Sequence, residues 1–150
     1  MEIAIAVNKV KKDQMFFNIN TQSHKHEIVV YSNVESYLNK NFGFTILTMY
    51  DLWNSNAKYY ISTCLNTTIN LLSSPKIEEI FFYVWDLEWT RFEYDYLNIK
   101  KIYLNDRVKL IARSDDHAKT INSAWNIFPS IAYDFNINDI IGVKNEKINI

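Results

Sequence analysis

The sequence predicts an α/β fold, a Rossmann-like three-layer sandwich with a mainly parallel sheet of about six to seven strands. Short strand-like segments alternate with helical segments along the 150 residues, which is the order that a parallel sheet requires. Residues 80–85 form an unbroken apolar run, typical of a strand buried on both faces in the middle of such a sheet. Hydrophobic residues make up 48% of the chain, so we expect one domain spanning residues 1–150.

Strands are expected wherever β-branched and aromatic residues form short runs between polar residues. The expected strands are residues 3–7, 26–32, 44–50, 58–62, 80–85, 108–112 and 131–135. In the first of them Ile and Val alternate with alanine, whose small side chain lets a helix approach the sheet closely.

Helices in the first part of the chain are less regular. Residues 10–21 fit either a helix or a strand, and we favour a helix. Asn33 can cap a short helix from Val34 to about Lys40, because its side-chain oxygen accepts from first-turn amides. Gly43 ends that helix at a position that commonly needs left-handed backbone.

Ser62 or Thr63 is expected to cap a helix that runs through Leu72. Its apolar stripe would comprise Leu65, Ile69 and Leu72, which are spaced by four and three residues. Pro75 prevents the helix from continuing.

Residues 95–104 are expected to form another helix. Its expected buried residues are Leu97 and Ile102. Ser114 caps the helix that follows residues 108–112. The buried face of that helix comprises Ala118, Ile121 and Trp125. Asn136 or Asn138 caps a last short turn.

Composition excludes several classes of protein. With 16 basic and 17 acidic side chains, the net charge is -1, which gives no electrostatic basis for binding nucleic acid. Cys64 is the only cysteine, so no internal disulfide forms, as in proteins of reducing compartments. Neither a signal peptide nor an apolar run of about 20 residues is present, so we expect no membrane association. The expected location is the cytoplasm, or the host cytoplasm for a viral protein.

Charged residues follow the fifth expected strand, at the end where such folds usually present chemistry. Asp86 and Glu88 would share one face, roughly 7 Å apart, if the strand stays extended past Trp85. Such a pair suits a general base with a partner, and both carboxylates are therefore candidate catalytic residues. Trp85 and Trp89 could stack on sugar rings or bases, and Arg91 could bind substrate. Alternatively, Asp86 is only a helix or turn cap.

A second polar group follows the sixth expected strand. Backbone amides at a helix N-terminus bind anions, and Arg113 could add a fork for phosphate or carboxylate. Ser114 and His117 are candidate substrate contacts beside it. Asp115 and Asp116 already supply negative charge there, so helix capping explains them equally well.

Ser62 and Thr63, at the end of the fourth expected strand, would join the same rim if the sheet is parallel. They are candidate substrate-binding residues, and helix capping is again the alternative. His24 and His26 are two ligands without a third, so we expect no metal site. No glycine-rich phosphate loop follows the first strand, where residues 8–12 stand, so no cofactor is expected.

Several of these segments resemble the N-terminal, acceptor-side half of a GT-B-type glycosyltransferase, especially phage-encoded glycosyltransferase-like proteins. The resembling segments are residues 26–32, 60–63, 82–89, 110–117 and 133–135, in the family's order. Residues 85–89, Trp-Asp-Leu-Glu-Trp, are the most distinctive. The resemblance implies a Rossmann-like acceptor-binding half whose rim faces an interdomain cleft. Two features of the family have no counterpart here: the Gly-rich turn after the first strand, and the second half with its donor contacts.

The resemblance implies a protein that binds a sugar or nucleotide acceptor, with Asp86 as base and Glu88 and Arg113 orienting the acceptor. Donor binding would need a second chain, and the partners would be a nucleotide sugar or sugar acceptor. The alternative is a non-catalytic phage module that binds a host protein or sequesters a nucleotide. A homo- or hetero-oligomer is expected, and in the non-catalytic role Trp53, Trp89 and tyrosine residues would anchor the interface.

Overall fold

Seven strands form an all-parallel sheet in the order β3-β2-β1-β4-β5-β6-β7. The computed structural model describes residues 1–34, 42–91 and 96–143. The strands are β1 (Glu2–Val7), β2 (Glu27–Ser32), β3 (Thr45–Thr48), β4 (Tyr59–Ser62), β5 (Ile80–Val84), β6 (Val108–Ala112) and β7 (Ser130–Ile131). The predicted α/β fold with a Rossmann-like three-layer architecture is confirmed.

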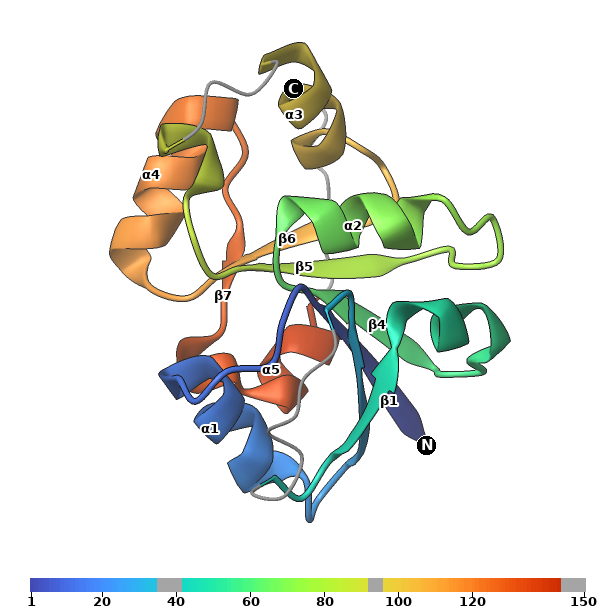
Figure 1. Ribbon diagram of the computed structural model, residues 1–150. Helices are drawn as coiled ribbons and strands as arrows, with labels where there is room; N and C mark the ends of the chain where they lie inside the picture. Colours follow the sequence, from blue (N-terminus) through green and yellow to red (C-terminus); the bar gives the residue numbers. More distant parts are fainter. Residues whose placement is uncertain (35–41, 92–95, 144–150) are drawn as a thin grey trace.

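Helices cover both faces of the sheet (Figure 1). On one face lie α1 (Gln14–Gln22) and α5 (Ile137–Ile141). On the other lie α2 (Leu65–Leu72), α3 (Tyr96–Tyr103) and α4 (Asp115–Trp125). None of the described helices combines the length and the hydrophobicity that a bilayer crossing requires.

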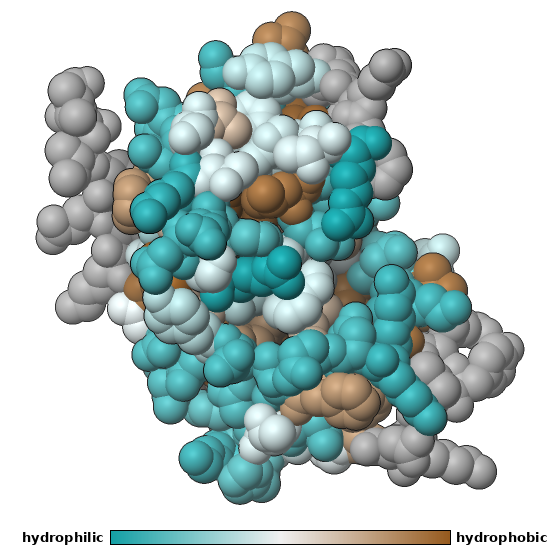
Figure 2. Space-filling view, turned by 90° about the vertical axis from the view of Figure 1, so that its left-hand side faces the viewer, coloured by the Kyte–Doolittle hydropathy of each residue, from teal (hydrophilic) through white to brown (hydrophobic). Residues whose placement is uncertain are grey.

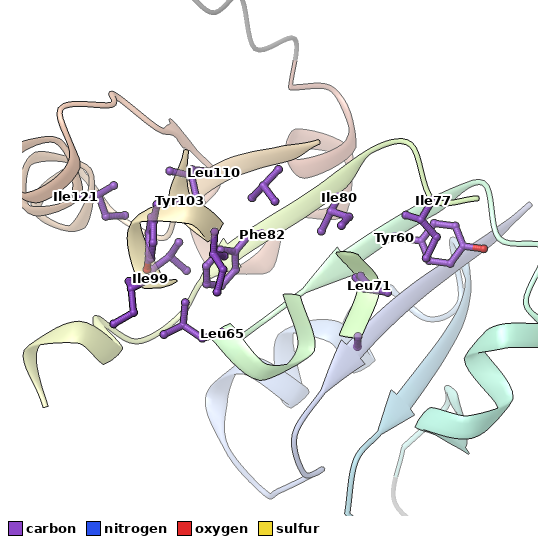
Figure 3. Close-up of a cluster of buried hydrophobic side chains, with 14 of the residues drawn as sticks. Tyr60, Leu65, Leu71, Ile77, Ile80, Phe82, Ile99, Tyr103, Leu110 and Ile121 are labelled. Carbon is purple, nitrogen blue, oxygen red and sulfur yellow. The ribbon is translucent and has the colours of Figure 1, made fainter. Parts of the chain in front are cut away.

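The two helical layers explain the unbroken apolar run of β5. Phe81 and Tyr83 pack in the layer of α1 and α5, whereas Phe82 and Val84 pack in the opposite layer. Figure 3 shows Phe82 among the buried side chains of that second layer. All residues of β5 are 0–2% exposed, as predicted for a strand covered on both faces.

Helix α2 begins later and faces differently than predicted. Its N-cap is Cys64, not Ser62 or Thr63. The predicted apolar stripe holds for Leu65, which is buried, and for Leu72, which is partly buried, but it was wrong at Ile69, which is 48% exposed. Thr67 and Thr68 are fully buried instead. These threonines can face inward because both hydroxyls donate to the Cys64 carbonyl oxygen, which satisfies their hydrogen bonding.

Two predicted strands end earlier than expected, and one predicted helix turns other residues inward. The third strand ends at Thr48, where Asp51 accepts hydrogen bonds from the Thr48 amide and hydroxyl and starts the 3₁₀ helix η2 (Met49–Asn54). The seventh strand ends at Ile131, and residues 133–135 form the 3₁₀ turn η4 (Tyr133–Phe135). In the helix predicted for residues 95–104, Leu97 is 65% exposed and the inward positions are Ile99, Ile102 and Tyr103.

Gly43 does not have the left-handed backbone expected of it, since no described glycine has positive φ. The helix predicted to precede it, at residues 34–40, falls almost entirely outside the described residues. Gly43 instead allows close packing, because a Cβ atom there would lie 2.7 Å from the Ser23 hydroxyl. Its amide donates to Asn20 Oδ1 at 2.6 Å.

Candidate functional site

Parallel pairing brings the two polar groups of the sequence to the same edge of the sheet. Val84, at the end of β5, pairs with Ala112, at the end of β6. Residues 85–91 and 113–117 therefore start side by side, and we call this surface the strand-end rim. Such an edge is where open parallel sheets usually bind ligands.

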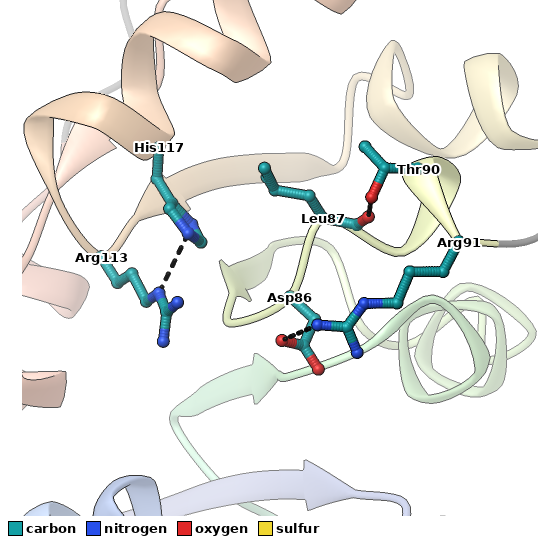
Figure 4. Close-up of polar contacts among 6 residues, drawn as sticks. All are labelled: Asp86, Leu87, Thr90, Arg91, Arg113 and His117. Carbon is teal, nitrogen blue, oxygen red and sulfur yellow. Dashed lines mark hydrogen bonds and ion pairs between the residues drawn. The ribbon is translucent and has the colours of Figure 1, made fainter.

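Arg113 joins Trp85 and His117 into one unit of the rim. Its guanidinium carbon lies 4.7 Å from the centroid of the Trp85 ring, a cation–π contact. Its Nε donates to His117 Nε2 at 3.1 Å (Figure 4). An accepting Nε2 means that the imidazole is neutral, with its proton on Nδ1. Burial lowers the pKa of His117, and the charge of Arg113 lowers it further, which favours the same neutral state.

Asp86 presents a partly exposed carboxylate in the turn after β5. Its Oδ1 lies 3.5 Å from Arg91 Nη2, and the Asp86 side chain remains 45% exposed. Figure 4 shows it between Arg91 and the pair formed by Arg113 and His117. The charge of Asp86 also acts on His117, so these groups share one electrostatic environment. An exposed ion pair of this kind contributes little to stability, which leaves Asp86 available to a ligand.

Glu88 turns inward. The premise that the strand continues past Trp85 was wrong, because β5 ends at Val84 and a 3₁₀ turn, η3 (Glu88–Thr90), follows. Glu88 Oε1 accepts a hydrogen bond of 2.9 Å from the amide of Leu65, the first residue of α2. Burial raises the pKa of Glu88, and the charge of Asp86 raises it further.

Other predicted contact residues also have structural partners. Ser62 and Thr63 are buried, and their hydroxyls bond to the Thr68 hydroxyl at 2.7 Å and to the Ala6 carbonyl at 3.0 Å. Trp89 packs edge-on against Tyr103 and Trp125, with centroid distances of 5.3 and 5.6 Å.

Ser114 caps α4 by accepting from the amide of His117 at 3.2 Å. The rim therefore brings together a smaller group than the sequence suggested. Its members are Trp85, Asp86, Arg91, Arg113 and His117.

Carboxylates stand at the N-termini of α1, α2 and α4. In α1, Asp13 accepts a hydrogen bond of 3.2 Å from the Phe16 amide. In α2, Glu88 accepts from the amide of the first residue, Leu65. In α4, Asp115 and Asp116 lie in the first turn. A phosphate would meet these negative charges at the positions where helix N-termini usually bind it. The rim thus favours a ligand without phosphate.

Among the described residues, no group of three or more His, Cys, Asp or Glu side chains could hold a metal ion. The side of the molecule at the left of Figure 1, where β5 and β6 end, is mostly hydrophilic, with small hydrophobic areas between (Figure 2). Sequence reasoning missed a polar groove between α1 and residues 133–139. Its signal was the recurrence of amide and hydroxyl side chains on one side of α1, at Gln14, Asn18 and Thr21.

The described geometry therefore offers a hydrophilic rim in which the partly exposed carboxylate of Asp86 lies near an arginine fixed on an aromatic ring and a neutral imidazole. The Asp86 carboxylate can accept a proton from a hydroxyl, and the Arg113 guanidinium can donate hydrogen bonds to oxygen atoms. Comparison of the chain with protein-family models and with curated proteins found no match.

Proposed function

We propose that the strand-end rim binds the acceptor of a sugar-transfer reaction, a sugar or nucleoside with a free hydroxyl group. The observation that carries this proposal is the open carboxylate of Asp86 beside the unit formed by Trp85, Arg113 and His117. The resemblance of residues 82–89 and 110–117 to acceptor-side glycosyltransferase segments supports the same reading.

Three rim residues have roles in this reaction. Trp85 offers an aromatic surface to the acceptor ring, and the Arg113 Nη atoms can donate to its oxygen atoms. Asp86 accepts the proton of the acceptor hydroxyl as that oxygen attacks the anomeric carbon of the donor. The new bond joins the anomeric carbon to the acceptor oxygen, and the bond to the donor phosphate breaks. Asp86 then passes the proton to water.

Glu88 is a positioning residue in this scheme. Its bond to the Leu65 amide fixes the turn that carries Asp86 against the start of α2. The donor is bound elsewhere, on a second chain or subunit. Carboxylates at the N-termini of α1, α2 and α4 oppose a nucleoside diphosphate at this rim, which supports that division of roles.

Sugar transfer from a panel of nucleotide sugars tests the proposal, with wild type, Asp86→Asn and Glu78→Gln. Glu78 is an exposed carboxylate that precedes β5, at the opposite end of the strand from Asp86, so its variant is the matched control. Asp86→Asn should lower the rate about 10²–10⁴-fold, as for loss of a general base. A parallel NMR titration with simple glycosides should shift the amides of residues 85–91. Absence of both turnover and rim shifts would refute the proposal.

A non-catalytic interaction role has its own supporting observation. In η2, Tyr50 is 85% exposed and Trp53 is 50% exposed, and aromatic side chains of this kind anchor protein interfaces. In this reading the chain is a subunit of a homo- or hetero-oligomer, and a phage module of this type would bind a host protein. Solution mass, with Trp53→Ala as the variant, separates the two. A wild-type oligomer that dissociates in Trp53→Ala supports the interaction role, and a monomer opposes it.

A further inference from the structure

A polar groove of about 510 Å³ lies between α1 and the segment formed by η4 and α5. It is formed by other residues than the strand-end rim: none of Trp85, Asp86, Arg91, Arg113 or His117 lines it. Its volume is within the range of pockets that hold small molecules.

One wall of the groove is a polar side of α1. Gln14, Asn18 and Thr21 line it and are spaced by four and three residues, so they share one side of the helix. Phe16 and Ile19, on the other side, are buried in the core. The groove-facing side thus consists of neutral groups that both donate and accept hydrogen bonds.

The opposite wall contains a strained turn that is held from two directions. Asp134 and Phe135 have φ values of 52° and 54°, which residues other than glycine seldom adopt. Gln22 donates to the Phe135 carbonyl and accepts from the Ile137 amide, both at 2.8 Å. Tyr83 donates to the Ala132 carbonyl at 2.8 Å and accepts from the Phe135 amide at 3.3 Å. Such strain persists only where the surroundings enforce it, and it concentrates at binding sites.

The turn supplies two side chains to the groove. Tyr133 is 53% exposed, and its hydroxyl donates to Asp115 Oδ2 at 2.7 Å, which orients the ring. Asp134 lines the groove beside it, and Asp139 adds a second carboxylate from α5. Neither carboxylate takes part in an ion pair within the described part of the chain. Both therefore remain free to accept hydrogen bonds from a ligand.

The lining selects the chemistry of the ligand. The lining contains the carboxylates of Asp134 and Asp139 together with Lys25 and His26. The two carboxylates outnumber the one lysine, and this excess of negative charge opposes a phosphate or another anion. The described side chains of the groove do not form a metal-binding group, since none of three or more ligands is present in residues 1–34, 42–91 and 96–143. Carboxylates, amides and an exposed tyrosine ring together match a neutral ring that carries several hydroxyls. We infer that this groove is a second site, which binds a neutral sugar through Asp134 and Asp139 with Tyr133 against the sugar ring.

NMR titration of uniformly labelled protein tests the inference, with glucose, galactose, mannose, N-acetylglucosamine and ribose at millimolar concentrations. The test variant is the double substitution Asp134→Asn and Asp139→Asn, because asparagine tolerates the left-handed backbone of residue 134. It should weaken binding about tenfold or more, as expected when charged hydrogen bonds are lost. Asn138→Ala removes one exposed amide of the groove, and it replaces the double variant as the test variant if the double variant does not fold.

The inference is supported if at least one sugar causes saturable chemical-shift changes in the amides of residues 133–139. The affinity measured from these changes should be weaker in the double variant and unchanged in Glu78→Gln. Shifts restricted to residues 85–91 would support only the rim and overturn the groove. Binding of spermidine without binding of any sugar would also overturn it, because the carboxylates would then be selecting a cation. Sugar binding in the groove does not depend on the proposed rim function, because the two sites are formed by different residues. Asp86→Asn should therefore leave the chemical-shift changes of residues 133–139 unaltered.

Discussion

The carboxylate of Glu88 accepts a hydrogen bond from the amide of Leu65 at 2.9 Å, although the two residues belong to different strand-to-helix connections. Leu65 is the first residue of α2, so a charge from the turn after β5 stands at the positive end of that helix. The contact joins the polypeptide that carries Asp86 to the neighbouring helix. The Glu88 carboxylate therefore contributes both to the conformation of the rim and to the stability of α2.

Replacement of Glu88 by glutamine should therefore change the pH dependence of stability. Burial and Asp86 raise the folded pKa of Glu88 above its ordinary 4.5, so the folded state holds this proton more tightly than the unfolded state. The stability that the proton contributes is complete below pH 4.5 and is lost as the pH rises through the folded pKa. As the pH rises from 4.5 through the folded pKa of Glu88, the free energy of unfolding of wild type should thus fall relative to that of Glu88→Gln. The difference should stay below about 1.4 kcal/mol per pKa unit, because water screens part of the carboxylate.

Urea unfolding of both proteins between pH 4 and pH 8 measures this difference, a range that spans the pKa values of free carboxylates and imidazoles at about 4.3 and 6.5. Glutamine keeps an oxygen that can accept from the Leu65 amide, so the comparison isolates the charge. A difference that stayed constant, or that grew in favour of wild type as the pH rose, would contradict the assigned environment of Glu88.

Arg113 should control the titration of His117. Burial lowers the pKa of His117 below 6.5, and the Arg113 guanidinium lowers it further. Arg113→Met removes that charge and the donor to Nε2, so the pKa of His117 should rise. NMR titration of the imidazole measures it, with Arg91→Met as the control because Arg91 pairs with Asp86. An unchanged His117 pKa in Arg113→Met would show that the Arg113 contact does not act on it.

The depressed pKa of His117 also has a consequence for stability, opposite in sign to that of Glu88. The unfolded state takes up the proton more readily, so the stability contributed by neutral His117 is present above pH 6.5. It is lost as the pH falls through the folded pKa. Arg113→Met should reduce this loss, whereas Glu88→Gln should leave it unchanged, and the two effects can therefore be separated in one pH series.

The fold was predictable because its main signals are local. The apolar run of β5, the strand β6 and the Ser114 cap of α4 each follow from a few adjacent residues. The inward turn of Thr67 and Thr68 was not predictable in this way. A pattern treats threonine as polar, but both hydroxyls bond to a main-chain carbonyl and so become suitable for burial.

The candidate site was predictable only in part, for the same reason. Parallel pairing of β5 with β6 brings Asp86 and Arg113 to one edge, which follows from strand order. The inward direction of Glu88 depends on Leu65, 23 residues earlier, and no local pattern contains that information. The turn at Asp134 is held by Gln22, whose bond to Phe135 spans 113 residues. Contacts of this kind arise from packing of the layers rather than from periodicity.

Tyr83→Phe should destabilise the protein by about 1–3 kcal/mol, because it leaves buried backbone groups without a partner. The Tyr83 hydroxyl donates to the Ala132 carbonyl and accepts from the Phe135 amide, and burial raises its pKa to about 12. Urea unfolding gives the free energy difference. Tyr59→Phe, at a partly buried tyrosine packed against the same core, is the control and should cost less. Equal losses for the two variants would show that the Tyr83 hydroxyl does not hold the strained turn.

Arg107 should contribute more to stability than any exposed ion pair, because it closes the other end of α2. Its Nη1 donates to the Leu72 carbonyl at 2.9 Å, and its Nε donates to the Ile77 carbonyl at 3.0 Å. Leu72 is the last residue of α2, so the guanidinium also compensates the negative end of the helix.

Arg107→Lys tests this arrangement, because lysine keeps the charge but lacks the planar fork of donors with which Arg107 reaches the carbonyls of Leu72, Ser74 and Ile77. The expected loss is at least about 2 kcal/mol, corresponding to one or two charged hydrogen bonds. Arg91→Lys, in the exposed pair with Asp86, is the matched control and should cost less than about 0.5 kcal/mol. Urea unfolding with an unchanged denaturant slope measures both. If Arg107→Lys lowered the free energy of unfolding no more than Arg91→Lys, the planar geometry of the guanidinium would be irrelevant. The positive charge of Arg107 alone would then account for its role.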